Sequence, residues 1–327
     1  MKNKIKVGII GGAGYTGGEL IRLLVNHANV ELIFVHSKSN AGKAIHSVHQ
    51  DLAGSTNMHF SDKTTDEVDA LFLCVGHGDS KKFLEQSEIS ADVKVISLSQ
   101  DFRLAKNSVF KNRTFVYGLP EINRDKIKTA HDIANPGCFA TCIELGLLPL
   151  AKENDLQDIY TTGITGSTGA GQTLSATSHF SWRQNNVQAY KSLTHQHLSE
   201  INESLNSLSG STSASIHFVP WRGDFARGIF VTSQLKSSKS LEELYHLFES
   251  FYAGHPFVKV CKDPIFLKQA VNTNNCFLHI EKEQENIVIH SVIDNLLKGA
   301  SGQAVQNMNL MFGVDESEGL RLKANYF

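Results

Sequence analysis

One short segment near the start of the chain restricts its fold more than any other. The apolar, β-branched run 4–10 is typical of a buried strand, and it ends in Gly11-Gly12-Ala13-Gly14-Tyr15-Thr16-Gly17. Apolar residues then recur at helical spacing over 17–27. Glycines permit a tight turn and a close approach to a phosphate, and the free N–H groups of a helix start attract an anion. The pattern predicts a strand, a phosphate-binding turn and a helix, the alternative being a glycine turn without a ligand.

The following segments extend this pattern into a domain. Strands are expected at 30–35, 70–75 and 93–98, separated by helix-length segments, and the first 119 residues contain no proline. Such alternation implies right-handed crossovers and a doubly wound, Rossmann-type parallel sheet of the α/β class, assigned to residues 1–137.

The second half of the chain has a different pattern. Strands are expected at 215–219, 228–235, 276–281 and 286–293, with a helix at 241–252 and a Ser- and Gly-rich surface loop at 204–215. This mixture indicates an α+β domain with an antiparallel or mixed sheet, assigned to residues 138–302. The last apolar helix is expected to return to the first domain, which therefore also takes residues from about 303 to 327. Two domains agree with a length of 327 residues.

Composition excludes several classes of function. The 31 Lys and Arg against 33 Asp and Glu give a net charge of −2, without the basic excess of a nucleic-acid binder. No apolar run is long enough to cross a membrane. The five cysteines form no CxxC pair, so a reduced, cytoplasmic protein without a zinc site is expected.

The end of the second strand indicates which dinucleotide is bound. NAD-binding folds usually carry a carboxylate there for the ribose 2′-hydroxyl, whereas this chain has His36-Ser37-Lys38-Ser39. A cation beside hydroxyl groups favours a 2′-phosphate and therefore NADP(H), unless Lys38 is only a solvated loop residue. The expected cofactor-binding residues in this half of the chain are Gly11, Gly12, Gly14, Tyr15, Thr16, Gly17, Ser37 and Lys38.

A cysteine follows the turn Asn135-Pro136-Gly137. The residues after it, 142–148, are helix-like, so Cys138 is expected at a helix N-terminus, where the helix dipole lowers a thiol pKa. Cys138 is therefore a candidate nucleophile, and the alternative is a buried, inert cysteine. Cys142 lies one turn further along the helix, where it would either pack or pair with Cys138.

Two other motifs carry polar groups suited to chemistry. His195 and His197 are separated by one residue, and the alternatives are surface histidines, a metal site or acid–base catalysis. No third metal ligand is evident near them, so no metal is expected. Arg103 either reaches a cleft, where it would bind substrate oxygens, or pairs with Asp101 at the surface.

The segment 133–149 resembles the active-site signature of the N-acetyl-γ-glutamyl-phosphate reductase family, whose relatives include aspartate-semialdehyde dehydrogenase. The resemblance extends over nearly the whole chain. It includes the glycine turn and the motifs at 101–103, 117–121, 168–171, 195–197 and 292–304.

The resemblance implies roles for particular residues. Cys138 would be the nucleophile, and His195, the first histidine of an H-x-H-x-x-E motif, the acid–base group. Arg103, Glu200, His197 and Gly169 would lie at the substrate, and Gly302 and Gln303 at the nicotinamide side of the cofactor. The family usually has Arg after the Gly-Ala-Gly motif, where this chain has Gln172, which removes one positive charge.

The implied activity is the NADPH-dependent reductive dephosphorylation of N-acetyl-γ-glutamyl phosphate in arginine biosynthesis. It would proceed through a cysteine thioester, with release of inorganic phosphate, in a homodimer or homotetramer. Alternative substrates are N-succinyl-glutamyl phosphate, an aminoadipyl phosphate or that of aspartate-semialdehyde dehydrogenase. Two rival hypotheses from other classes are an NADPH-binding redox sensor that uses Cys138 and Cys142, and a cysteine hydrolase.

Overall fold

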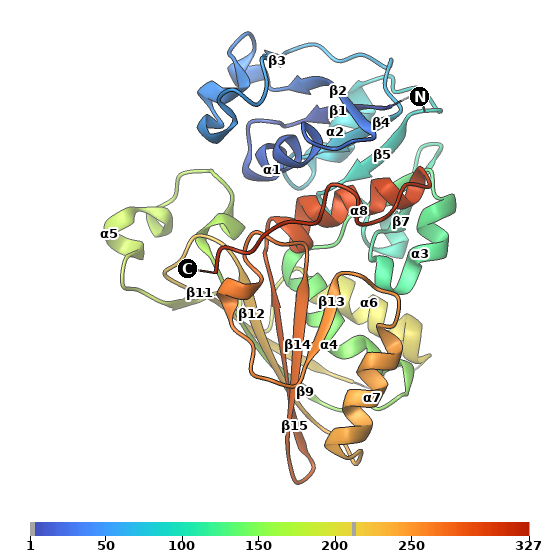
Figure 1. Ribbon diagram of the computed structural model, residues 1–327, viewed down its shortest axis with the longest axis vertical. Coiled ribbons are helices and arrows are strands. Elements are labelled where there is room, and N and C mark those ends of the chain that lie inside the picture. Colours follow the sequence, from blue (N-terminus) through green and yellow to red (C-terminus); the bar gives the residue numbers. More distant parts are fainter. Residues whose placement is uncertain (1–3, 211–213, 327) are drawn as a thin grey trace. The chain divides into compact units, whose positions relative to one another are not determined.

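The computed structural model describes residues 4–210 and 214–326, and the chain divides into two compact units (Figure 1). The first unit contains residues 1–137 and 300–321, and the second contains residues 138–299 and 322–327.

The first unit is built on an eight-stranded sheet in the order β3-β2-β1-β4-β5-β8-β7-β6. All neighbours are parallel except β6 and β7. The order from β3 to β5 is that of a doubly wound dinucleotide-binding sheet, which confirms the predicted fold class. The strands are β1 (Ile5–Ile10), β2 (Val30–His36), β3 (Phe60–Ser61), β4 (Ala70–Leu73), β5 (Lys94–Ser97), β6 (Val109–Phe110), β7 (Arg113–Tyr117) and β8 (Asp132–Ala134).

The α-helices described in this unit are α1 (Tyr15–Leu24), α2 (Asp79–Gln86), α3 (Pro120–Thr129) and α8 (Gly302–Met311). Helix α8 packs against α1 and α3. The Asn307 side chain donates to the Gly118 carbonyl at 2.8 Å, and Asn309 is hydrogen-bonded to His27. These buried polar contacts fix the helix in the first unit.

The part of the chain assigned to the first unit ends earlier than expected. Residues 322–327 belong to the second unit, whereas the sequence placed the whole stretch from about 303 to 327 in the first. The backbone N–H of Asn325 donates to the Val271 carbonyl at 3.1 Å. This bond attaches the last residues to the second unit.

The second unit is built on a seven-stranded mixed sheet in the order β10-β11-β9-β12-β15-β14-β13. The pairs β11–β9 and β13–β14 are parallel and the others are antiparallel. The strands are β9 (Ile159–Thr165), β10 (Gln188–Ala189), β11 (Ile216–Arg222), β12 (Ile229–Lys236), β13 (Val258–Cys261), β14 (Cys276–Glu283) and β15 (Asn286–Ile293).

The helices α4 (Cys138–Lys152), α6 (Leu198–Ser209) and α7 (Leu241–Phe251) pack together, and α4 contacts β12, β14 and β15. The short helix α5 (Phe180–Arg183) lies on an arm between β9 and β10 (Figure 1). The loop predicted at 204–215 is partly wrong, because α6 continues to Ser209 and ends at Gly210, whose φ is +66°. Residues 211–213 of that prediction lie outside the described residues.

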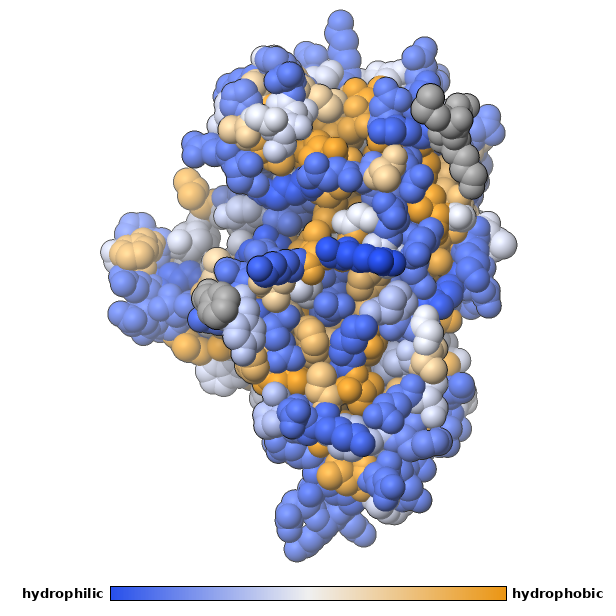
Figure 2. Space-filling model, viewed as in Figure 1, coloured by the Kyte–Doolittle hydropathy of each residue, from blue (hydrophilic) through white to orange (hydrophobic). Residues whose placement is uncertain are grey.

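Figure 2 shows mostly hydrophilic side chains on the viewed face, with apolar side chains scattered among them. Within residues 4–210 and 214–326, none of the helices has the length and apolar character that crossing a membrane requires.

Candidate functional site

The glycine turn between β1 and α1 has the geometry that a bound phosphate requires. Gly11 has a φ of +80°. A Cβ on Gly17 would lie 2.6 Å from the Gly11 carbonyl oxygen, so only glycine fits there. The first turn of α1 has no acidic residue, and no side chain caps its N-terminus. Its start therefore presents backbone N–H groups and the positive end of the helix dipole, which suits a pyrophosphate.

The start of α8 is fixed against this turn. The Ser301 hydroxyl donates to the carbonyl of Thr16 at 2.9 Å, and both residues belong to the first unit. Gly302 and Gln303 are buried in the first turn of α8. The two segments expected to hold the cofactor in this unit therefore contact each other.

The second strand ends as the cofactor hypothesis requires. Ser37 is buried and its backbone N–H donates to the Ser61 carbonyl, whereas the next residue, Lys38, is exposed. An exposed cation beside an ordered hydroxyl fits a 2′-phosphate, and the strand end lacks the carboxylate that would repel one. These residues therefore fit NADP(H).

Cys138 is the first residue of α4 and is half-buried. The first turn of this helix has no acidic residue, so the helix dipole acts on the thiol without an opposing charge there. Gly299 lies against Cys138: a Cβ at position 299 would be 2.8 Å from the Cys138 Cβ. A glycine at 299 is therefore required for this close approach to Cys138.

Arg103 is buried and stabilises the turn that precedes Cys138. Its Nε donates to the Asn135 carbonyl at 2.8 Å, and its Nη2 donates to the Leu98 carbonyl at 2.9 Å. The alternative of a surface pair with Asp101 is wrong, since Asp101 accepts the backbone N–H groups of Gly78 and Lys81. Arg103 therefore positions the cysteine turn through backbone contacts.

Cys142 and Cys276 are buried on either side of the Ser291 hydroxyl. Each sulfur is 3.4 Å from Ser291 Oγ. Burial raises the pKa of the Cys142 thiol well above its ordinary value. Cys138 and Cys142 are not joined by a disulfide, so Cys142 packs in the interior rather than pairing with Cys138.

His195 is buried in the second unit, 5% exposed, with its ring against Phe139, Phe218 and Tyr190. Its Nδ1 accepts the backbone N–H of His197 at 3.2 Å, which places the proton of the neutral ring on Nε2. Burial, with a smaller effect from Lys191, lowers the pKa of His195 to about 4. At neutral pH this side chain is therefore an uncharged Nε2–H donor.

His197 and Glu200 are also buried, at the start of α6. His197 Nε2 lies 3.9 Å from Glu200 Oε1, and the rings of His195 and His197 are perpendicular with centroids 4.6 Å apart. The two histidines are thus adjacent, although they precede a helix rather than share a strand face. Among residues 4–210 and 214–326, no three His, Cys, Asp or Glu side chains are grouped as a metal site requires.

The loop that contains Gly169 was expected to offer backbone N–H groups to an anion. In the structure the N–H groups of 166–169 and 171 donate to carbonyls of the protein, those of 166–168 to Gly228, Phe225 and Ala226. Gln172 is exposed and carries no charge. These five donors are therefore already used within the fold and are not available to an anion.

Two residues beside His195, Tyr190 and Arg222, were not among the site residues predicted from the sequence. The Tyr190 and His195 ring centroids are 5.9 Å apart, and the Arg222 guanidinium carbon lies 4.5 Å from the Tyr190 ring centroid. Burial, followed by the charge of Cys138, raises the pKa of Tyr190 to about 12. The only available signal was the position of Arg222 near the end of an expected strand, since functional groups often follow strand ends.

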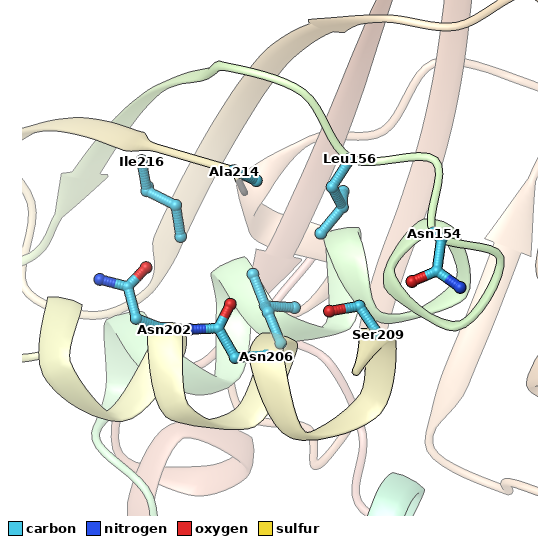
Figure 3. A pocket seen from close by; sticks show the side chains of 8 residues that line it. Asn154, Leu156, Asn202, Asn206, Ser209, Ala214 and Ile216 are labelled. Carbon is cyan, nitrogen blue, oxygen red and sulfur yellow. The ribbon is translucent and has the colours of Figure 1, made fainter. Parts of the chain in front are cut away.

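A separate pocket in the second unit lies between α6 and the segments around Leu156 and Ile216 (Figure 3). Asparagine, serine and apolar side chains line it, with Asn202 and Asn206 on the α6 side. It has no cysteine, histidine or charged side chain and is therefore not the candidate catalytic site.

Comparisons with known proteins agree with this geometry. Residues 6–130 match the semialdehyde dehydrogenase NAD binding domain, and residues 138–295 match the semialdehyde dehydrogenase dimerisation domain. The fold resembles that of aspartate semialdehyde dehydrogenase II from Vibrio cholerae, complexed with ASA, with a TM-score of 0.73 and 16% identity over 95% of this chain and 99% of that one.

Relatives in sequence are much closer. An N-acetyl-gamma-glutamyl-phosphate reductase from Bacteroides thetaiotaomicron is 54% identical over 99% of this chain and 100% of its own length. One from Flavobacterium johnsoniae is 52% identical with the same coverage. The chain belongs to the semialdehyde dehydrogenases and, within them, to the N-acetyl-gamma-glutamyl-phosphate reductase family.

Proposed function

We propose that the chain catalyses the NADPH-dependent reduction of an N-acyl-γ-glutamyl phosphate to the corresponding semialdehyde, with N-acetyl-γ-glutamyl phosphate as the principal substrate. The observation that carries the proposal is Cys138 at the start of α4 in the same unit as the neutral, buried His195. The family membership and the glycine turn support the same activity.

Cys138 performs the covalent part of the reaction. Its thiolate attacks the γ-carbonyl carbon, a carbon–sulfur bond forms, and the carbon–oxygen bond to phosphate breaks, so that inorganic phosphate leaves and a thioester remains. The cofactor, when bound, supplies the hydride that reduces the thioester carbonyl. Expulsion of the Cys138 thiolate then releases the semialdehyde.

His195 stabilises charge on the reacting oxygen. Each tetrahedral intermediate carries a negative oxygen, and a preorganised donor in a buried site lowers its energy. The Nε2–H of His195 is such a donor, because Nδ1 is held by the His197 N–H. The attacking thiolate is regenerated when the semialdehyde leaves, so neutral His195 acts as an electrostatic catalyst in these steps.

The residues fit the proposed cofactor. The turn at 11–17 would hold the pyrophosphate, Ser37 and Lys38 the 2′-phosphate, and Gly302 and Gln303 the nicotinamide side. Arg103, Gly169, His197 and Glu200 remain proposed substrate-site residues, Arg103 through its hold on the cysteine turn.

The test is the reverse reaction, followed at 340 nm as the phosphate-requiring reduction of NADP⁺ by N-acetyl- and N-succinyl-glutamate semialdehyde. Turnover that requires phosphate and is lost in Cys138→Ser is the expected result. Folded, NADPH-binding protein without turnover of either substrate would refute the proposal. Hydrolysis of the acyl phosphate without cofactor would instead favour the hydrolase alternative.

We also propose a homodimer formed through the open face of the seven-stranded sheet. Helix α4 packs on the face that contains Val231 and Ile289, so alternation along the strands places Tyr160 and Val288 on the other face. Tyr160 is 58% exposed there. The match to a dimerisation domain supports this partner. Sedimentation of wild type should show a dimer, and Tyr160→Asp should weaken the association. A monomeric wild type would refute the proposed homodimer.

A further inference from the structure

Two arginines of the second unit lie close together beside the candidate catalytic residues. Arg222 is the last residue of β11, with Gln188 of β10 opposite it on one side and Thr165 of β9 on the other. Arg183 is the last residue of α5, and its Nη2 donates to the carbonyl of Gly223, the residue after Arg222. The strand end thus brings two guanidinium groups to one place.

No carboxylate of the described residues is in direct contact with either guanidinium group. Neither forms an ion pair with a described residue, and the nearby carboxylate, Asp224, accepts the Asn185 backbone N–H at 2.6 Å. Burial lowers the pKa of Arg183 and the charge of Arg222 lowers it further, against smaller opposite effects of Asp224 and Tyr190. Two like charges held together have an energetic cost that a bound anion would remove.

Tyr190 connects this pair with the catalytic residues. Its ring contacts the Arg222 guanidinium on one side and the edge of the His195 ring on another. Arg222 also donates to Thr177 Oγ1 at 3.3 Å, which fixes its direction. One aromatic ring therefore lies between the guanidinium and His195, so an anion held by Arg222 is separated from His195 by that ring.

We infer that Arg183 and Arg222 bind a carboxylate of the substrate, remote from the reacting γ-carbon. A guanidinium matches a carboxylate through paired N–H donors. The Gly169 loop does not supply such a group, because five of its backbone N–H groups donate to carbonyls of the protein and Gln172 is uncharged. The inference rests on the proposed function, in which the substrate carries an α-carboxylate and, with an N-succinyl group, a second carboxylate.

The experiment compares wild type with Arg222→Met, Arg222→Lys and Arg183→Met in the phosphate-requiring oxidation of both semialdehydes. The expected result is an increase in KM for the semialdehyde of about tenfold or more in both methionine variants. Arg222→Lys should raise KM less than Arg222→Met does, because lysine keeps the positive charge but lacks the paired N–H donors of a guanidinium. The control variant Lys262→Met removes an exposed charge from the same unit and should leave KM unchanged for both semialdehydes.

The two substrates distinguish which carboxylate is bound. An equal increase in KM for both assigns the arginines to the shared α-carboxylate, and an increase confined to the N-succinyl substrate assigns them to the acyl group. Unchanged KM values would overturn the inference, as would an effect on the KM for phosphate alone. Both of these results would be obtained with an active wild type and would leave the proposed function intact. An inactive wild type that still binds NADPH would instead refute the proposed function.

Discussion

The buried His195 should make the second unit unstable in mild acid. Its pKa is lowered from 6.5 to about 4 by burial, so the folded unit keeps the ring neutral where the unfolded chain binds a proton. The contribution of His195 to the free energy of unfolding is therefore constant above pH 6.5 and falls as the pH decreases. Linkage gives a loss of about 2 kcal/mol at pH 5 and almost none at pH 7.5, reaching about 3 kcal/mol below pH 4.

The perturbation is His195→Asn, which removes the titration while its amide oxygen can still accept the His197 N–H. The assay is urea unfolding at a series of pH values, followed by tryptophan fluorescence. Both tryptophans of the chain, Trp182 and Trp221, lie in the second unit, so the signal reports on the unit that contains His195.

Between pH 7.5 and pH 5, the free energy of unfolding should decrease by about 2 kcal/mol more in wild type than in His195→Asn. Other titrating groups are shared by both proteins and cancel in the difference. The variant His179→Asn, which replaces an exposed histidine, should follow wild type. Parallel curves for wild type and His195→Asn would refute the reasoning, because they would show that the folded and unfolded states bind a proton at this ring equally.

Three further outcomes are expected from single substitutions. In Gly299→Ala the new Cβ would lie 2.8 Å from the Cys138 Cβ, so we expect kcat to fall about 100-fold with little change in NADPH affinity; an unchanged kcat would contradict the close contact. Lys38→Ala should raise the Kd of NADPH about tenfold and leave that of NADH unchanged in a fluorescence titration, and equal effects on both would argue against a 2′-phosphate contact. Cys142→Ala should retain activity and the rapid alkylation of one thiol by iodoacetamide, followed by mass spectrometry, because the raised pKa of the Cys142 thiol makes it unreactive; loss of that alkylation would show that Cys142 is the reactive residue.

The first unit was predictable because its signals are local. The glycine turn is contiguous, and the strands β1, β2, β4 and β5 are short apolar runs separated by helix-length segments. Strand ends were less predictable: β4 ends at Leu73, two residues before the apolar run does. Apolar character continues where backbone pairing has stopped, so composition alone does not mark the boundary.

The helix α6 shows how packing overrides local preference. Six of the twelve residues of 204–215 are serine, and this composition indicated a loop. The buried Ile201 and Leu205, one turn apart, give the helix an apolar face that packs against α4. Burial against a neighbour outweighs a weak intrinsic preference, and that neighbour is not visible in a sequence window.

In the candidate site too, some residues are signalled by a local motif and others are brought together only by the fold. Cys138 follows from a contiguous turn and helix, whereas Tyr190 and Arg222 reach His195 from the arm and from the end of β11. The Gly169 loop looked suited to an anion because of its glycines, yet its backbone donors are used within the fold. Only the pairing of distant segments decides which donors remain available to a ligand.

Two cysteines on one helix show that environment, rather than residue type or spacing, determines reactivity. Cys138 and Cys142 are one turn apart on α4. Cys142 is fully buried near Ser291 and Cys276, where no charge stabilises a thiolate, and its hydrogen bonds to Ser291 help to hold the helix on β15. Cys138 is half-buried at the helix start, with Gly299 leaving room beside it. The inert thiol thus helps to fix the helix that carries the other thiol at its N-terminus, and a disulfide between the two would require the Cys142 thiol to lose its hydrogen bonds to Ser291. This argues against the redox-sensor hypothesis and in favour of Cys138 as a nucleophile.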